Sequence, residues 1–244
     1  MKFAFITDPL DKLKPYKDSS VAMMREAARR GHEIWAIQRE QLAWEGGSVS
    51  ALAVRIVPQA DNAAWYTAHE TQTWALQDFD GVMMRQDPPF DMEYVTATWL
   101  LERAVASGAR IFNDPRAIRD HSEKVSIAEF PQYTAETQIA RDAAVINAFI
   151  EKHGDVVLKP LDGMGGSSIF RVRGDDPNRN VIIEVLTENG AKTIMAQRFL
   201  PAITDGDKRI LIIDGKPVPY SLARIPMAGE TRGNLAAGGT PEAR

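Results

Sequence analysis

The chain has 244 residues, 44% hydrophobic and 25% charged, a composition typical of a soluble globular protein with one large or two modest domains. A net charge of −4 excludes the global basic excess of most nucleic-acid-binding proteins, and the absence of cysteine excludes disulfides, a thiol nucleophile and a Cys-ligated zinc site. No apolar run is long enough to span a membrane, and Asp8-Pro9 interrupts the N-terminus before any signal-peptide core could form, so we expect a cytoplasmic protein without a membrane partner.

The first third of the chain alternates strand and helix patterns. Residues 2–7 read as a strand, Asp18, Ser19 and Ser20 offer N-caps for a helix that stops at Gly31, and "HEIWAI" is the next strand. The pattern repeats in "FDGVMMR", in a helix from Asp91 to about Val105, and in "ARIFN". Such β-α-β units predict an open α/β domain with a parallel sheet.

Ligands of open α/β sheets bind at the carboxyl ends of the strands. Arg85 follows the strand "FDGVMMR" directly, which makes it a candidate site residue. The alternative is that Pro88-Pro89 simply ends the strand and begins a loop. Spacing alone favours the second interpretation.

The character of the sequence changes after residue 115, and we place a domain boundary near His121. A short helix over 114–120 and a helix from Asp142 to Lys152, ended by Gly154, come first. From Val156 onward we expect mainly β structure, including the strand "AKTIMAQRFLP". A last hairpin over 207–225 turns at Asp214-Gly215, which is a type I′ signal.

The stretch "VVLKPLDGMGGSSIFRVR", residues 156–173, carries the clearest chemical signal. Glycines let backbone N–H groups approach an anion closely, and a lysine supplies charge, so Lys159 beside Gly163, Gly165 and Gly166 indicates phosphate binding. A P-loop would need the lysine after the glycines and a helix next. Here β-branched and aromatic residues follow, so we predict a Gly-rich β-hairpin.

Other charged residues gather in the β-rich part: Lys124, Arg209, Arg224 and Arg232. Each alone is more typical of a solvated surface, yet together with Lys159 they indicate a positively lined nucleotide cleft suited to phosphoryl transfer. The histidines lack zinc-site spacing, and there is no G-x-S-x-G elbow. The tail "RIPMAGETRGNLAAGG" fits either a disordered terminus or a lid over a ligand.

Several long motifs, in order along the whole chain, resemble the bacterial glutathione synthetase family of ATP-grasp ligases. They are "KDSSVAMMREAARRGHE", "MRQDPPFDMEY", "KPLDGMGGSSIFRV", "AQRFLPAITDGDKRILIIDGKPVPYSLARIP" and "GETRGNLAAGG". The resemblance implies an N-terminal open parallel-sheet α/β domain over 1–121 on the substrate side, followed by an incomplete α+β ATP-grasp domain. The latter comprises a lid subdomain over 122–200 and, over 201–244, the start of the C-terminal subdomain with a mobile Gly-rich loop.

The family's reaction, as the resemblance implies it, joins γ-glutamylcysteine to glycine with ATP and Mg²⁺ through an acyl phosphate, in a homo-oligomer. The implied ATP-binding residues are Lys124, Lys159, Gly163, Met164, Gly165, Gly166, Gln197, Phe199, Leu200 and Asp207. The implied catalytic residues are Arg209, Arg224 and Arg232, and the implied substrate-binding residues are Asp18, Ser19, Arg85 and Asn234.

The family's acidic and amide ligands for Mg²⁺ are expected beyond Arg244, and the sequence offers no substitute for them. Asp205, Asp207 and Asp214 are scattered on turns, where acidic residues are common. We therefore expect a glutathione synthetase sequence that lacks its metal segment, with an exposed edge on its last sheet. The alternatives are another ATP-grasp carboxylate–amine ligase, such as a peptide-modifying or D-alanine ligase, or a non-catalytic nucleotide-binding or oligomerising fragment.

Overall fold

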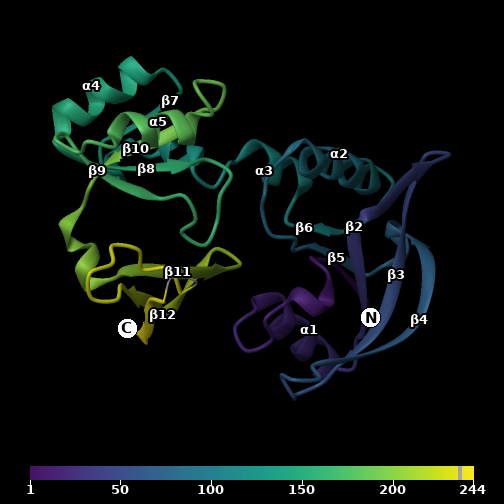
Figure 1. Cartoon of the computed structure of the whole chain (residues 1–244). Helices are drawn as coiled ribbons and strands as arrows, with labels where there is room; N and C mark the ends of the chain where they lie inside the picture. The colour runs from purple at the N-terminus through teal and green to yellow at the C-terminus, as the bar shows by residue number, and fades with distance from the viewer. Residues whose placement is uncertain (236–237) are drawn as a thin grey trace. The chain divides into compact units, whose positions relative to one another are not determined.

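A computed structural model describes residues 1–235 and 238–244 and divides the chain into two compact units (Figure 1). Unit 1 covers Met1–Ser122 and unit 2 covers Glu123–Arg244. Each unit has its own hydrophobic core. Among the described residues, no helix is both long and apolar enough to cross a membrane.

Unit 1 is built on one six-stranded sheet with the order β4-β3-β2-β1-β5-β6. Its strands are β1 (Lys2–Ile6), β2 (Glu33–Glu45), β3 (Ser48–Pro58), β4 (Tyr66–Ala75), β5 (Gly81–Met84) and β6 (Ile111–Phe112). The strands β2, β1, β5 and β6 run parallel, as predicted. The antiparallel strands β3 and β4, which the sequence did not predict, extend the sheet beyond β2.

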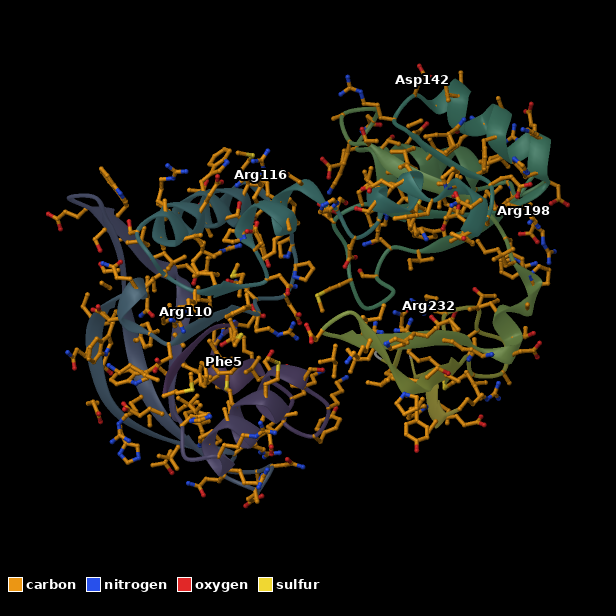
Figure 2. All side chains as sticks on the ribbon, turned by 180° about the vertical axis from the view of Figure 1, so that it is seen from behind. Phe5, Arg110, Arg116, Asp142, Arg198 and Arg232 are labelled. Atoms are coloured by element: carbon orange, nitrogen blue, oxygen red, sulfur yellow. The ribbon has the colours of Figure 1, made fainter. Side chains whose placement is uncertain are left out.

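Helices cover both faces of this sheet because successive residues of β1 point to opposite sides. Phe5 packs in the cluster that holds Val21 and Met24 of α1 (Ser19–Arg29), and it is labelled in Figure 2. Ala4 and Ile6 pack in the cluster that contains residues of α2 (Met92–Ala106). The predicted caps are confirmed: Asp18 accepts the N–H groups of Ser20 and Val21, and Asp91 accepts that of Tyr94. The remaining elements of unit 1 are α3 (Pro115–Asp120) and the short 3₁₀ helices η1 (Leu10–Lys12) and η2 (Leu76–Asp78).

The first sheet of unit 2 is antiparallel, with the order β7-β10-β8-β9. It consists of β7 (Thr137–Ala140), β8 (Asp155–Pro160), β9 (Phe170–Arg173) and β10 (Ile194–Arg198). The predicted Gly-rich hairpin is confirmed as the β8–β9 pair, and the predicted helix is confirmed as α4 (Ala143–His153), capped by Asp142 (Figure 2) and ended by Gly154. The 3₁₀ helices η3 (Val125–Glu129) and η4 (Pro131–Tyr133) precede β7.

The helix α5 (Arg179–Thr187) corrects the expectation of mainly β structure after Val156. Its sequence "RNVIIEVLT" is rich in β-branched residues, which locally favour a strand. In the structure, Ile183 and Leu186 lie one helical turn apart and are buried in the same core as Val156 and Leu158 of β8. Tertiary packing therefore overrides the local preference, and α4 and α5 lie together over this sheet (Figure 1).

A second, three-stranded sheet of unit 2 has the order β11-β12-β13. Its strands are β11 (Asp207–Ile213), β12 (Lys216–Ile225) and β13 (Thr240–Ala243), preceded by η5 (Pro201–Asp205). The predicted turn is confirmed, because Asp214 and Gly215 both have positive φ, as a type I′ turn requires. The apolar side chains of Ile210 and Ile212 are more than half exposed on β11.

Candidate functional site

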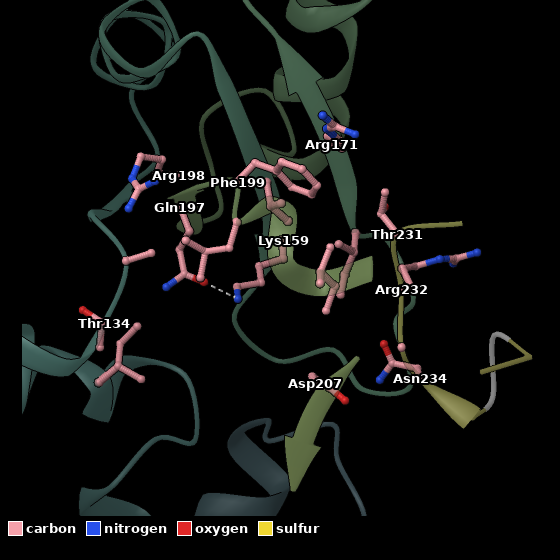
Figure 3. A pocket seen from close by; sticks show the side chains of 17 residues that line it. Thr134, Lys159, Arg171, Gln197, Arg198, Phe199, Asp207, Thr231, Arg232 and Asn234 are labelled. Carbon is pink, nitrogen blue, oxygen red and sulfur yellow. Dashed lines mark hydrogen bonds between the residues drawn. The ribbon is translucent and has the colours of Figure 1, made fainter. Parts of the chain in front are cut away.

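The helix-free face of the β7-β10-β8-β9 sheet carries a pocket of about 390 Å³ (Figure 3). Alternation along β8 sends Val156 and Leu158 into the core under the helices and leaves Val157 and Lys159 on the pocket side. The polar and charged lining residues are Thr134, Lys159, Arg171, Arg198, Gln197, Asp207, Thr231, Arg232 and Asn234. Apolar walls come from Ile127, Val157, Ile169, Phe199, Leu200 and Ile203.

Lys159 projects into this pocket and is held by a chain of hydrogen bonds. Its Nζ donates to Oε1 of Gln197 at 2.5 Å, drawn in Figure 3, and Nε2 of Gln197 donates to Oγ1 of Thr137 at 2.8 Å. Burial lowers the pKa of Lys159, and the positive charge of Lys124 lowers it further. A bound anion would offset both effects, so the surroundings of Lys159 favour a negatively charged ligand.

Lys124 connects the start of unit 2 to the Gly-rich loop between β8 and β9. Its Nζ donates to the carbonyl oxygen of Gly163 at 2.6 Å and pairs with Glu123 at 2.6 Å. In the same loop, Gly165 and Gly166 adopt φ values of +68° and +85°, which favour glycine strongly. The loop and the two lysines thus form one cationic corner of unit 2.

The Gly-rich tail lies against this loop. Nη1 of Arg232 donates to the carbonyl oxygen of Gly166 at 3.2 Å, and its Nη2 pairs with Glu230 at 2.6 Å. A Cβ atom on Gly166 would lie only 2.8 Å from Oδ1 of Asn234. The hydrogen bonds from Arg232 hold the pKa of Glu230 at about 2. The tail and the hairpin loop therefore approach each other as closely as a glycine permits.

The strand pair β11–β12 places Asp207 and Arg224 opposite each other. Nε of Arg224 donates to Oδ1 of Asp207 at 2.8 Å, and the second oxygen of Asp207 accepts from Nη2. Asp207 lines the pocket, whereas Arg209, two residues further along β11, is exposed and outside the lining set. Asp207 and Arg232 therefore both line the pocket. Arg209 lies on the exposed surface of the three-stranded sheet that contains β11.

The remaining predicted residues lie in unit 1. The carboxylate of Asp18 caps α1, and Ser19 is the first residue of that helix. Nε of Arg85 donates to Oγ of Ser20 at 3.1 Å, at the carboxyl end of β5. This fixes Arg85 beside the start of α1, while the local geometry assigns Asp18 a capping role.

Seven of the residues predicted from the sequence line the pocket: Lys159, Gln197, Phe199, Leu200, Asp207, Arg232 and Asn234. Met164, also predicted, lies in the Gly-rich loop with 48% of its surface exposed. Sequence reasoning missed other residues of the lining, among them Thr134, Ile169, Arg171 and Ile203. For Arg171 a signal existed: it lies opposite Val157 in the hairpin, so the period of two in "FRVR" places it on the same face as Lys159.

Both halves of the chain match family models. Residues 1–119 match the N-terminal domain of prokaryotic glutathione synthetase, and residues 123–244 match its ATP-grasp domain. The chain belongs to the prokaryotic glutathione synthetase family. These family members are ATP-grasp carboxylate–amine ligases that act on small molecules, as the sequence motifs predicted.

Curated glutathione synthetases agree with this assignment over the whole chain. The glutathione synthetase of Ralstonia nicotianae is 56% identical over 244 residues, which are 100% of this chain and 75% of the relative. That of Nitrosomonas europaea is 53% identical over 248 aligned residues, 100% of this chain and 77% of the relative.

Solved structures extend the likeness to the fold. D-cycloserine synthetase DcsG has a TM-score of 0.61 at 15% identity, covering 92% of this chain and 68% of its own. An ATP-grasp RimK domain protein from Sphaerobacter thermophilus has a TM-score of 0.56 at 20% identity, covering 87% and 69%. The α/β domain followed by an ATP-grasp domain is thus the architecture of this chain.

The family implies Mg²⁺, which prefers carboxylate and other oxygen ligands. Within residues 1–235 and 238–244, no group of three or more His, Asp or Glu side chains is close enough to hold a metal ion. Asp207, an acidic residue of the pocket lining, already binds Arg224 through both oxygens. The described residues do not by themselves form a magnesium site.

Proposed function

We propose that the pocket of unit 2 binds ATP and that the chain uses it to join γ-glutamylcysteine and glycine, giving glutathione, ADP and phosphate. The observation that best supports this proposal is the cationic corner. Lys159 lies within the pocket, and its pKa is lowered by burial and by the charge of Lys124. The loop that follows it contains Gly165 and Gly166, which both have positive φ. Family membership over both units supports the choice of reaction.

In this proposal the nucleotide spans the pocket from its apolar wall to its cationic corner. The base lies against Ile169, Phe199 and Leu200, and the backbone of residues 197–200 reads its edge. The phosphates lie by Lys124 and Lys159, under backbone N–H groups of residues 163–166. The two lysines and the N–H groups supply the charge that a triphosphate requires.

The proposed chemistry is two displacements. The cysteinyl carboxylate attacks the γ-phosphorus and releases ADP, and the glycine amine then attacks the acyl phosphate and releases phosphate. We assign stabilisation of the transferring phosphoryl group to Arg224 and Arg232, and to Arg209, which is exposed but lies on the same face of β11 as Asp207 of the pocket lining. We assign recognition of the dipeptide to Asp18, Ser19, Arg85 and Asn234. The tail that carries Arg232 would act as a lid, because an acyl phosphate must be kept from water.

ADP release by the 244-residue chain tests this function. With Mg²⁺ and ATP, we expect release only when γ-glutamylcysteine and glycine are both present, each being omitted in turn. Release with D-alanine and none with γ-glutamylcysteine would replace the substrate assignment by a D-alanine ligase. ATP binding without ADP release under all these conditions would contradict the ligase and leave a nucleotide-binding protein.

The variant Gly166→Ala tests the packing of the tail against the hairpin loop. A methyl group there would meet Asn234 at 2.8 Å, and alanine disfavours a φ of +85°. We expect the Kd for ATP to rise about tenfold, because roughly 1–2 kcal/mol of strain falls on the phosphate-binding conformation. Titration calorimetry with Mg-ATP measures the change.

The matched control is Gly174→Ala at the end of the same hairpin. A Cβ atom at Gly174 meets nothing closer than the carbonyl oxygen of Gly154 at 3.9 Å. Its Kd for ATP should equal that of the unaltered chain. Equal affinities for Gly166→Ala and Gly174→Ala would show that the loop conformation does not contribute to binding.

A further inference from the structure

Arg171 of β9 lies over the aromatic ring of Phe199 at the edge of the pocket (Figure 3). The central carbon of its guanidinium group is 3.7 Å from the ring centroid, which is van der Waals contact with the face of the ring. Phe199 itself is 8% exposed and follows β10 directly. The guanidinium group of Arg171 therefore restricts the orientation of the Phe199 ring. Arg171 is not among the residues to which the proposed ATP site gives a role.

Asp155 of β8 holds Arg171 in this place. Nε and Nη2 of Arg171 donate to the two carboxylate oxygens of Asp155, at 2.9 Å and 2.5 Å. This planar, two-point pairing restricts the guanidinium far more than a single contact would. The hydrogen bonds from Arg171 also lower the pKa of Asp155, so the pair stays ionised at neutral pH.

Asp155 also holds the backbone of Phe199. The N–H of Phe199 donates to the carbonyl oxygen of Asp155 at 3.0 Å. The main chain of Phe199 is thus held by a bond that no side-chain substitution removes, whereas one face of its ring packs against Arg171. Loss of Arg171 would remove the contact on that face and leave the strand in place.

We propose that Arg171 is a positioning residue for the nucleotide base, a role that rests on the ATP site proposed above. Clamped by Asp155, it holds the ring of Phe199 against the space that the base occupies. The cationic corner at Lys159 and Lys124 binds the phosphates independently of this stack. Arg171 therefore contributes to affinity through the base and to the preference between bases, and it touches neither the phosphates nor the reacting atoms.

Two variants of the full chain separate this role from a general structural one. Arg171→Lys keeps the charge and loses the planar fork, and the double variant Arg171→Met/Asp155→Asn removes the clamp without changing the net charge. For both we expect a Kd for Mg-ATP raised about three- to tenfold, the range for losing one partly buried cation–π contact. The ratio of GTP to ATP affinity should rise, and the Kd for inorganic tripolyphosphate should stay unchanged. Calorimetry measures all three ligands.

The matched control is Arg179→Met/Glu151→Gln, which removes another arginine–carboxylate pair of unit 2. This pair is separated by 3.3 Å, and neither residue lines the pocket. We expect this control to bind ATP as the unaltered chain does. Circular dichroism is the check that each variant is folded.

Three results would overturn the inference. Unchanged ATP affinity in both Arg171 variants removes the role of Arg171 while the ATP site stands. An equal loss of affinity for ATP and tripolyphosphate shows only structural support. Failure of the unaltered, folded chain to bind ATP overturns the proposed site itself, and with it this role.

Discussion

Lys159→Ala is expected to weaken ATP binding by about 10- to 100-fold, since a charge-assisted bond to phosphate is worth roughly 1.5–3 kcal/mol. The ammonium group lies within the pocket, where burial and Lys124 lower its pKa in the absence of a ligand. It stabilises a bound anion more there than it would in water, because the surroundings screen it less. The substitution removes the ammonium charge of Lys159 from the cationic corner and leaves the sheet intact.

Calorimetric titration with Mg-ATP measures this loss, and Lys152→Ala is the control. Lys152 lies on the exposed side of α4, on the helix-covered face of the same sheet. Removing its charge changes the net charge equally without reaching the pocket. A Kd for Lys159→Ala equal to that of Lys152→Ala would refute the phosphate-binding role of the hairpin.

Leu158→Ala is expected to reduce the free energy of unfolding by about 2–5 kcal/mol, the range for a leucine removed from a close-packed core. Leu158 precedes Lys159 on β8 and points to the other face, where it is fully buried with Ile146 and Ile183 of the two covering helices. The truncation would leave a cavity that α4 and α5 can fill only in part. Urea unfolding followed by far-ultraviolet circular dichroism measures the difference.

Leu211→Ala provides the comparison within the same unit. Leu211 is a strand residue of β11 with 56% of its surface exposed, so the same truncation should change the stability by less than about 0.5 kcal/mol. Equal destabilisation by the two substitutions would contradict the assignment of β8's two faces. Together, Leu158→Ala and Lys159→Ala separate stability from ligand binding at adjacent residues.

Local features of the sequence were sufficient to predict many of the elements. Asp18, Asp91 and Asp142 cap helices through hydrogen bonds that reach only two or three residues along the chain. The turn at Asp214-Gly215 depends on the φ values of two adjacent residues. Such interactions lie within a short window, so a short window of sequence reveals them.

The Gly-rich hairpin could also be predicted from the sequence, because its first strand, glycine loop and second strand follow one another directly. The lysine at the end of one strand and the glycines after it needed no distant partner to be noticed. The long family motifs then gave the architecture that the family comparison confirms.

The tertiary structure alone decided the rest. It made a helix of residues 179–187, because burial of Ile183 and Leu186 outweighs the strand preference of their β-branched neighbours. It added β3 and β4 to the sheet of unit 1 in antiparallel register.

The contacts of the site were likewise decided by the fold. Lys124 reaches the carbonyl of Gly163, 39 residues away, and Arg232 reaches that of Gly166, 66 residues away. The stack of Arg171 on Phe199 joins β9 to the residue that follows β10, and these two strands flank β8 on opposite sides. The sequence of this chain therefore determined which chemical groups were available, through local caps, turns and motifs. Long-range strand pairing and burial determined which of those groups meet, because they depend on the packing of the whole unit and not on any one segment.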